Sequence, residues 1–303
     1  MPQEQTSPWK LGGLSAFQLG KRTWAEMNRD DIFGRSAELA YYFFLAVFPA
    51  LFFVVSIFGI IAHGNPKFQQ QLMTYMGSMM PGEASGLMKQ TLQQIIEASS
   101  GTKLSLGLLA ALWTASGGMS SMMDVLNITY DVDEGRPFWK KRLVAIALTI
   151  AVSLLVIVAI VLILYGGDIA NMIFGKVGLG SAFSTVWKIA QWPVAIFCVV
   201  VAFAIVYYAA PDVEQPAWHW VSPGAVVGVG LWVIASIGFR VYLQFSNSYN
   251  KTYGALGGVI ILLLWFYITA FSFLTGSEVN SEIEHAAAER GEPEAKLPGQ
   301  KAA

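Results

Sequence analysis

The stretch LVAIALTIAVSLLVIVAIVLILYGG, residues 143–167, is a run of 25 residues without a single Asp, Glu, Lys or Arg. A helix of this length extends over roughly 37 Å, because each residue adds about 1.5 Å along the axis. The hydrocarbon core of a bilayer is about 30 Å thick, so the run is long enough to cross it. It predicts a transmembrane helix.

Five further windows are free of these charged residues: 39–62, 104–123, 189–211, 215–239 and 252–277. Hydrophobic residues make up 55% of the 303-residue chain and charged residues 13%, about half the share in a soluble domain. This composition excludes a soluble globular protein, a disordered chain and a disulfide-stapled secreted domain. We expect an all-α, polytopic membrane protein, a bundle of six transmembrane helices. Their expected ranges are about 37–62, 104–126, 143–166, 189–210, 217–240 and 254–277.

The distribution of Lys and Arg predicts the orientation of the chain. Twelve of the 19 lie in the N-terminal arm, the connection between the second and third spans, and the C-terminal tail, which share one side if six spans are present. The other side carries seven, spread over longer loops. Because cytoplasmic segments carry the excess of positive charge, both termini are predicted to be cytoplasmic.

Three segments are expected to lie outside the spans of the membrane domain, residues 37–280. Residues 1–36 are expected to form a cytoplasmic arm with a helix at the membrane surface. Residues 64–103, between the first two spans, are expected to form amphipathic helices on the outer side. Residues 281–303 are acidic and weakly hydrophobic, and are expected to be a cytoplasmic, largely disordered tail. The apolar residues of the arm that recur near helical spacing are Leu14, Phe17, Trp24 and Met27.

Proline and glycine residues predict bends and close contacts within the bundle. A proline inside the first span removes one backbone hydrogen bond and bends the helix. Small residues in the second and fifth spans allow helix backbones to approach closely. The residues assigned to helix packing, turns and kinks are Pro49, Gly117, Gly118, Gly224, Gly228 and Gly254.

Polar residues at the ends of the apolar windows are the candidate functional residues, because ionisable groups are costly in lipid and normally face a bundle interior or a watery cavity. The five candidates are Glu38, Asp124, Asn127, Arg240 and Glu278. Three of them, Glu38, Asp124 and Glu278, fall at the same expected depth on three different spans. We hypothesise that the five side chains line a polar path through the bundle.

Each candidate also has a purely structural interpretation. Glu38 is spaced for an ion pair with the arginine three residues before it. Asp124 and Asn127 face the same way and would anchor the connection that follows the second span. Arg240 would extend to the lipid headgroups. Glu278 would be a solvated carboxylate at the membrane boundary.

The sequence predicts no enzyme, cofactor or metal site. His63, His219 and His285 are far apart, and the single cysteine, Cys198, lies in an apolar window. No Cys, His and carboxylate group has the spacing of metal ligands, and there is neither a phosphate-binding Gly-Lys-Ser/Thr loop nor a Gly-x-Ser-x-Gly motif. A net charge of −1 argues against a surface that binds nucleic acid.

Three blocks of sequence are specific enough to suggest a family. They are ELAYYFFLAVFPALFFVVSIFG (38–59), LWTASGGMSSMMDVLNITYDVDEGRPFWKKR (112–142) and residues 220–282, which begin WVSPGAVVGVGLWVIASIGFRVY. In order and spacing they resemble the signatures of the YihY/virulence factor BrkB family of bacterial membrane proteins. The resemblance covers about residues 35–285 and implies six membrane helices and an inner-membrane location. It implies no settled activity, because members have been labelled as ribonuclease BN, as serum-resistance factors and as transporters.

The leading functional expectation is a transporter or permease that moves a small solute, an ion or a lipid. One alternative is a non-transporting scaffold or envelope-integrity protein whose polar residues only specify packing. A remote alternative is a membrane-tethered ribonuclease, for which the chain lacks a basic surface and an acid–base site. The expected partners are the lipid bilayer and an unidentified substrate, with no nucleic acid, and the sequence leaves homo-oligomerisation open.

Overall fold

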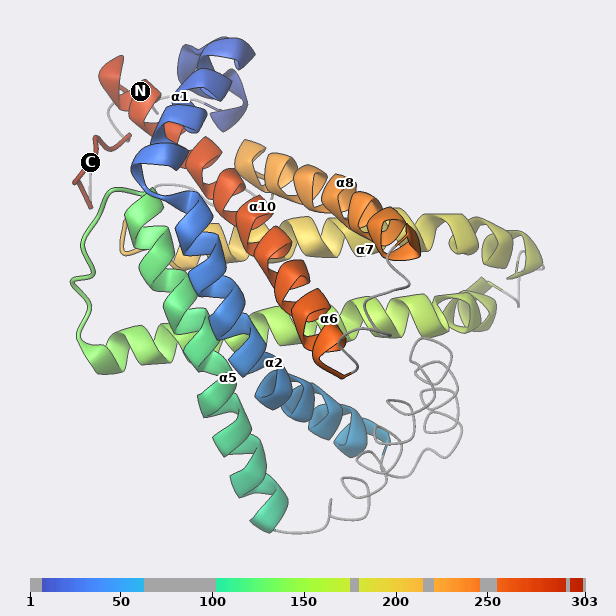
Figure 1. Ribbon diagram of the computed structural model, residues 1–303. Coiled ribbons are helices and arrows are strands. Elements are labelled where there is room, and N and C mark those ends of the chain that lie inside the picture. Colours follow the sequence, from blue (N-terminus) through green and yellow to red (C-terminus); the bar gives the residue numbers. More distant parts are fainter. Residues whose placement is uncertain are drawn as a thin grey trace, which may run out of the picture. The chain divides into compact units, whose positions relative to one another are not determined.

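The computed structural model describes residues 7–62, 102–174, 180–214, 221–245, 255–292 and 295–301, and all regular structure within these ranges is helical (Figure 1). The chain divides into a larger unit, Met1–Phe44 with Gly118–Ala303, and a smaller unit, Leu45–Gly117. The elements are the 3₁₀ helix η1 (Pro8–Gly13) and the α-helices α1 (Ala16–Arg29), α2 (Ile32–Ala62), α5 (Thr102–Thr129), α6 (Phe138–Phe174), α7 (Gly180–Ala209), α8 (Pro223–Phe245) and α10 (Ala255–Glu289).

The six long helices correspond to the six expected spans, which confirms the all-α membrane architecture. Five contain segments long and apolar enough to cross a membrane: Ile32–Val54, Phe138–Leu162, Ile189–Ala209, Pro223–Gln244 and Gly257–Glu289. The sixth, α5, is the least apolar of the long helices because glycine, serine and threonine interrupt its leucine-rich sequence. The expected helices at 64–103 and the turn at Gly254 fall almost entirely outside the described residues. Pro49 lies within α2, as expected.

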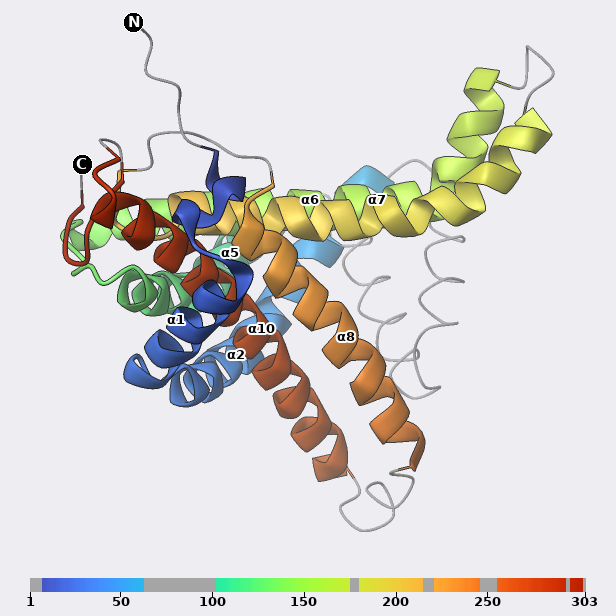
Figure 2. The same ribbon diagram turned by 90° about the horizontal axis from the view of Figure 1, so that it is seen from above.

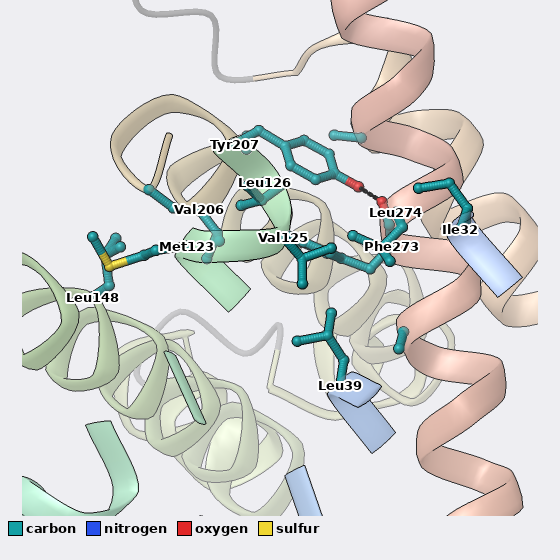
Figure 3. Packing of buried hydrophobic residues seen from close by; sticks show 14 of the residues in the cluster. Ile32, Leu39, Met123, Val125, Leu126, Leu148, Val206, Tyr207, Phe273 and Leu274 are labelled. Carbon is teal, nitrogen blue, oxygen red and sulfur yellow. Dashed lines mark hydrogen bonds between the residues drawn. The ribbon is translucent and has the colours of Figure 1, made fainter. Parts of the chain in front are cut away.

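The larger unit is built from two helix pairs. Figure 2 shows α6 beside α7 and α8 beside α10, the pairs with the most extensive contacts in this unit. Their buried side chains meet those of the first turns of α2 and the end of α5 in a single apolar cluster (Figure 3). Tyr207 lies inside this cluster, and its hydroxyl donates a 2.5 Å hydrogen bond to the carbonyl of Phe273. This bond satisfies a polar group that burial would otherwise penalise.

The crossing of α8 and α10 depends on glycine. A Cβ atom added at Gly224 would collide with the carbonyl oxygen of Gly276, and one added at Gly228 would lie 3.0 Å from the carbonyl oxygen of Ser272. The two helices therefore approach backbone to backbone, as small residues permit in membranes. A Cβ added at Gly117 meets no described atom within 4 Å, so its expected packing role stays a prediction. Its neighbour Gly118 is buried.

Helix α1 is amphipathic, and two of the four expected apolar positions of the arm, Leu14 and Met27, pack inside the protein. A capping box between Ser15 and Gln18 starts the helix. The buried positions are Leu19, Thr23 and Met27, which follow one another at intervals of four residues. Leu14 packs on the same side, but Phe17 and Trp24 are 83% and 57% exposed. The buried side of the helix contacts α10, where Leu19 packs against Val279 and Ile283. The position of α1 at the membrane surface stays a prediction.

The C-terminal segment also differs from the expected disordered tail. Helix α10 continues to Glu289, because the sequence after the apolar window contains helix-forming Glu and Ala and no glycine before Gly291. Beyond the helix, the Lys296 ammonium lies 2.5 Å from a carboxylate oxygen of Glu284. The low hydropathy of this segment reflects paired charges rather than absence of structure.

Candidate functional site

The candidate site lies where α10 passes the turn between α1 and α2 and the connection that follows α5. The α1–α2 turn is tight, since Asp31 adopts a positive φ of 51°, a conformation that Asp tolerates better than most residues. The Asp31 carboxylate accepts a hydrogen bond from the Gly34 amide and so caps the start of α2. This turn places the preceding residue, Asp30, toward Glu278 of α10.

Glu278 is the central residue of the site. It is only 1% exposed, and its Oε1 atom has no hydrogen-bond partner among the described residues. Leaving a buried carboxylate oxygen unpaired costs free energy unless the group is neutral or binds a ligand. Glu278 is therefore a different case from the solvated boundary carboxylate that the sequence allowed.

Three further carboxyl groups surround Glu278. The charge of Asp30 acts on Glu278, and the charges of Glu26 and Asp131 act on both residues. Burial, reinforced by Asp131 and Glu26, raises the pKa of Asp30 to about 6. We refer to Glu26, Asp30, Asp131 and Glu278 as the acidic cluster.

One arginine neutralises part of the acidic cluster. Arg29 donates hydrogen bonds to Asp131 at 2.8 Å and to Glu26 at 3.1 Å. The charges of Asp131 and Glu26 raise the pKa of Arg29, so its cation is permanent. These bonds leave Asp30 and Glu278 as a pair without an ion pair to a cation in the described part of the chain.

The carboxylate one turn further along α10 is paired. Glu282 is 2% exposed, and the Arg22 guanidinium donates to its Oε2 at 2.7 Å. Arg22 also binds both carboxylate oxygens of Glu289, at 2.9 and 2.7 Å, and these bonds raise its pKa. His285 Nδ1 lies 3.9 Å from Glu282 Oε1 on the other side. Glu282 is thus compensated where Glu278 is not.

A second polar group surrounds Asn127 at the end of α5. Its amide donates to Glu134 at 3.0 Å, and its amide oxygen accepts from the backbone N–H of Asp212 at 2.7 Å. Arg136 donates to both oxygens of Glu134 at 2.8 Å and to the carbonyl of Ala210 at 2.7 Å. We refer to Asn127, Glu134, Arg136 and Asp212 as the anchor network.

Each carboxylate of the anchor network has a cation beside it: Glu134 pairs with Arg136, and Asp212 pairs with Lys301. Burial opposes ionisation of Glu134 and Asp212, yet hydrogen bonds from Arg136 and Lys301 hold the pKa of each carboxyl below its usual range. The Lys301 ammonium lies 2.5 Å from Asp212, which ties the C-terminal segment to the end of α7. This arrangement agrees with the structural interpretation of Asn127 as an anchor.

The structure gives the other expected path residues separate surroundings. Glu38 forms a 3.0 Å ion pair with Arg35, and Asp124 pairs with Lys141. Arg240 is exposed and lines an open groove of about 510 Å³ between α8 and α10, beside Gln244 and Trp265. A single path through all five candidates remains a prediction that these separate pairings do not favour.

Sequence reasoning identified Glu278 but missed the residues around it. Glu26, Asp30 and Asp131 lie in polar segments where charge is unremarkable, and only the fold brings them to α10. Among the residues that the structure describes, no group of three or more His, Cys, Asp and Glu side chains has a geometry suited to a metal ion.

Comparison with known proteins places the chain in a family. The family model described as virulence factor BrkB matches residues 23–298. The chain belongs to this family. The match includes α10, the acidic cluster and the anchor network, and it confirms the resemblance seen in the three sequence blocks.

Three relatives illustrate the similarity of the chain to known proteins. The "Putative ribonuclease-like protein YfkH" of Bacillus subtilis (strain 168) is 34% identical over 247 residues, which cover 82% of this chain and 88% of that protein. The UPF0761 membrane protein Smlt0865 of Stenotrophomonas maltophilia (strain K279a) is 25% identical over 272 residues, 88% of this chain and 61% of that protein. A UPF0761 membrane protein of Xanthomonas oryzae pv. oryzae (strain PXO99A) is 37% identical over 109 residues, 36% of this chain and 24% of that protein. No solved structure shows a significant match.

Proposed function

We propose that this BrkB-family membrane protein is a transporter that moves a small solute, an ion or a lipid. The observation that carries the proposal is Glu278, a fully buried carboxyl group on a long apolar helix with one oxygen unpaired in the described structure. A purely structural bundle gains no stability from such a group, because a neutral side chain would be less costly there. Buried ionisable groups in membrane helices normally serve ion or substrate pathways.

The proposal includes the location and orientation of the chain. It is an inner-membrane protein of a bacterium with both termini in the cytoplasm, as the Lys and Arg distribution favours. The acidic cluster then lies at the cytoplasmic end of α10. Reporter fusions after residues 135 and 290 are expected to report the cytoplasm, and a fusion after residue 178 the opposite side. Fusions after 135 and 178 on the same side contradict the orientation.

Flux measurements test the transport proposal. Purified protein is reconstituted into lipid vesicles and screened with ions, small solutes and fluorescent lipids. Wild-type vesicles are expected to move one of these classes faster than empty vesicles, and Glu278→Gln is expected to lose that activity. Asp133→Asn is the matched control, because Asp133 is an exposed carboxylate two residues from Asp131. Equal flux in the wild type and Glu278→Gln contradicts the assigned role of Glu278.

A scaffold is the second candidate function, and the anchor network favours it. Its charges are matched by hydrogen bonds and tie α5, α7 and the C-terminal segment together. A scaffold needs such connections and no exchangeable ligand. No flux in any class, with an envelope defect in cells that lack the protein, supports the scaffold. The proposal assigns no catalytic step to the chain.

A further inference from the structure

The acidic cluster contains more acids than its cation can neutralise. Two elements supply the acids at its centre, Asp30 from the α1–α2 turn and Glu278 from α10, and the charge of Asp30 acts on Glu278. Glu278 is fully buried, and its Oε1 atom has no hydrogen-bond partner in the described structure. Binding of a proton makes this carboxyl group neutral and removes the cost of burying its charge.

The other charged groups that face this pair do not replace the proton. Arg29, at the end of α1, directs its hydrogen bonds to Glu26 and Asp131. Arg22, also on α1, binds Glu282 and Glu289. The remaining acidic neighbours, Glu26 on α1, Asp131 after α5 and Glu282 on α10, add negative charge that, like burial, disfavours ionisation of Glu278. Tyr130, directly after α5, also faces Glu278, and burial raises the pKa of its hydroxyl, so it stays neutral.

Burial acts in the same direction. Glu278 is 1% exposed and its Oε1 atom is unpartnered in the described structure, so water does not stabilise a charge there. The pKa of Asp30 is raised to about 6, chiefly by burial.

We propose that Glu278, beside Asp30, forms a proton-binding site whose proton stays bound at neutral pH. Loss of that proton leaves Glu278 negatively charged beside Asp30, Glu26 and Asp131. The carboxylates of Glu278 on α10 and Asp30 in the α1–α2 turn then repel each other. Binding and release of the proton are thus linked to the contact between these elements. The inference concerns protonation and stands whether or not the protein transports a solute.

Glu282 provides an internal comparison on the same helix. It is four residues from Glu278 and equally buried, but Arg22 supplies its counter-charge at 2.7 Å. An ion pair of this kind holds the carboxylate ionised, so Glu282 carries no proton at neutral pH. The proposal therefore assigns the proton to one of two neighbouring buried glutamates.

Infrared spectroscopy of the purified full-length protein tests the proposal. A protonated carboxyl group absorbs separately from a carboxylate, so the bound proton gives a carbonyl band in wild-type protein at neutral pH. The band is expected to disappear on alkaline titration and to be lost in Glu278→Gln, and to persist in Glu282→Gln and Asp133→Asn. Absence of the band in the wild type at neutral pH, or its persistence in Glu278→Gln, overturns the proposal.

Carbodiimide labelling gives a second readout, because the reagent modifies protonated carboxyl groups in apolar surroundings. Mass spectrometry is expected to find the modification on Glu278 or Asp30 and not on Glu282. If Glu278→Gln does not fold, the wild-type titration and the wild-type labelling site still decide the question. Loss of the wild-type band on addition of Mg²⁺ or Ca²⁺ at constant pH overturns the proposal in favour of a metal cation.

Discussion

The acidic cluster and the anchor network both gather buried or half-buried carboxylates at the ends of membrane helices, but they satisfy them differently. In the anchor network each carboxylate has an arginine or lysine within hydrogen-bonding distance. In the acidic cluster one arginine serves Glu26 and Asp131, and Glu278 retains an unpaired oxygen in the described structure. The carboxylates of the anchor network therefore stabilise the fold through their ion pairs, whereas burial of Glu278 without a cation costs free energy if it is ionised.

The largest expected effect comes from breaking the anchor network. Arg136→Ala removes hydrogen bonds to Glu134 and to the carbonyl of Ala210, and it leaves a partly buried carboxylate without its counter-charge. We expect the free energy of unfolding in detergent to fall by about 3 kcal/mol. Chemical denaturation measures this, with Lys141→Ala as control, because its partner Asp124 is exposed and such pairs contribute less than about 1 kcal/mol. Equal losses in both variants would remove the distinction between network and surface pair.

The next largest effect is expected at the crossing of α8 and α10, where the helices are held by close packing rather than by charge. Gly224→Ala places a Cβ atom against the carbonyl of Gly276, and separating α8 from α10 is expected to cost about 2 kcal/mol. Gly230→Ala on the same helix is the matched control, because its Cβ meets no described atom within 4 Å. Thermal unfolding of the two variants compares them. A Gly224→Ala protein as stable as Gly230→Ala contradicts the close approach of the helices.

The smallest effect is a pH dependence within the acidic cluster. The pKa of Asp30 is raised from 3.8 to about 6, so its contribution to stability is full below about pH 4 and is lost as pH rises through about 6. Asp30→Asn avoids that loss. Because Asp30 is only half-buried, we expect the variant to be more stable than wild type by on the order of 1 kcal/mol at pH 8, and no more stable at pH 4. Denaturation at the two pH values measures the difference, and an advantage that grows toward acid pH contradicts the assignment.

The sequence predicted the membrane helices well, because a charge-free run long enough to cross a bilayer has few other structural solutions. It also pointed to Glu278, the first charged residue after such a run. It could not predict the partners of Glu278, because Asp30 and Asp131 lie more than a hundred residues away in polar turns. Nor could hydropathy predict the extension of α10 to Glu289, since residues of α1 and the C-terminal segment, which the pattern of a single helix does not record, compensate charges of that segment.

Sequence alone also could not show which of the five polar residues expected along the path have a neighbouring counter-charge. Equal depth in the membrane placed Glu38, Asp124 and Glu278 together, whereas local pairing decides what each one does. Glu38 and Asp124 have neighbouring cations on the surface. Only Glu278 is fully buried among other acids, and this environment follows from tertiary contacts that no local pattern records.

The most direct test of the account compares Glu278→Gln with Glu282→Gln by chemical denaturation at pH 7. The two glutamates are one helical turn apart and are 1% and 2% exposed, so the variants differ chiefly in whether a charge partner is lost. The account predicts that Glu282→Gln lowers the free energy of unfolding by about 2 kcal/mol because it removes a partner of Arg22, and that Glu278→Gln changes it by less than about 0.5 kcal/mol. An equal or larger loss in Glu278→Gln would show that Glu278 is an ionised, paired structural residue, and would contradict the account.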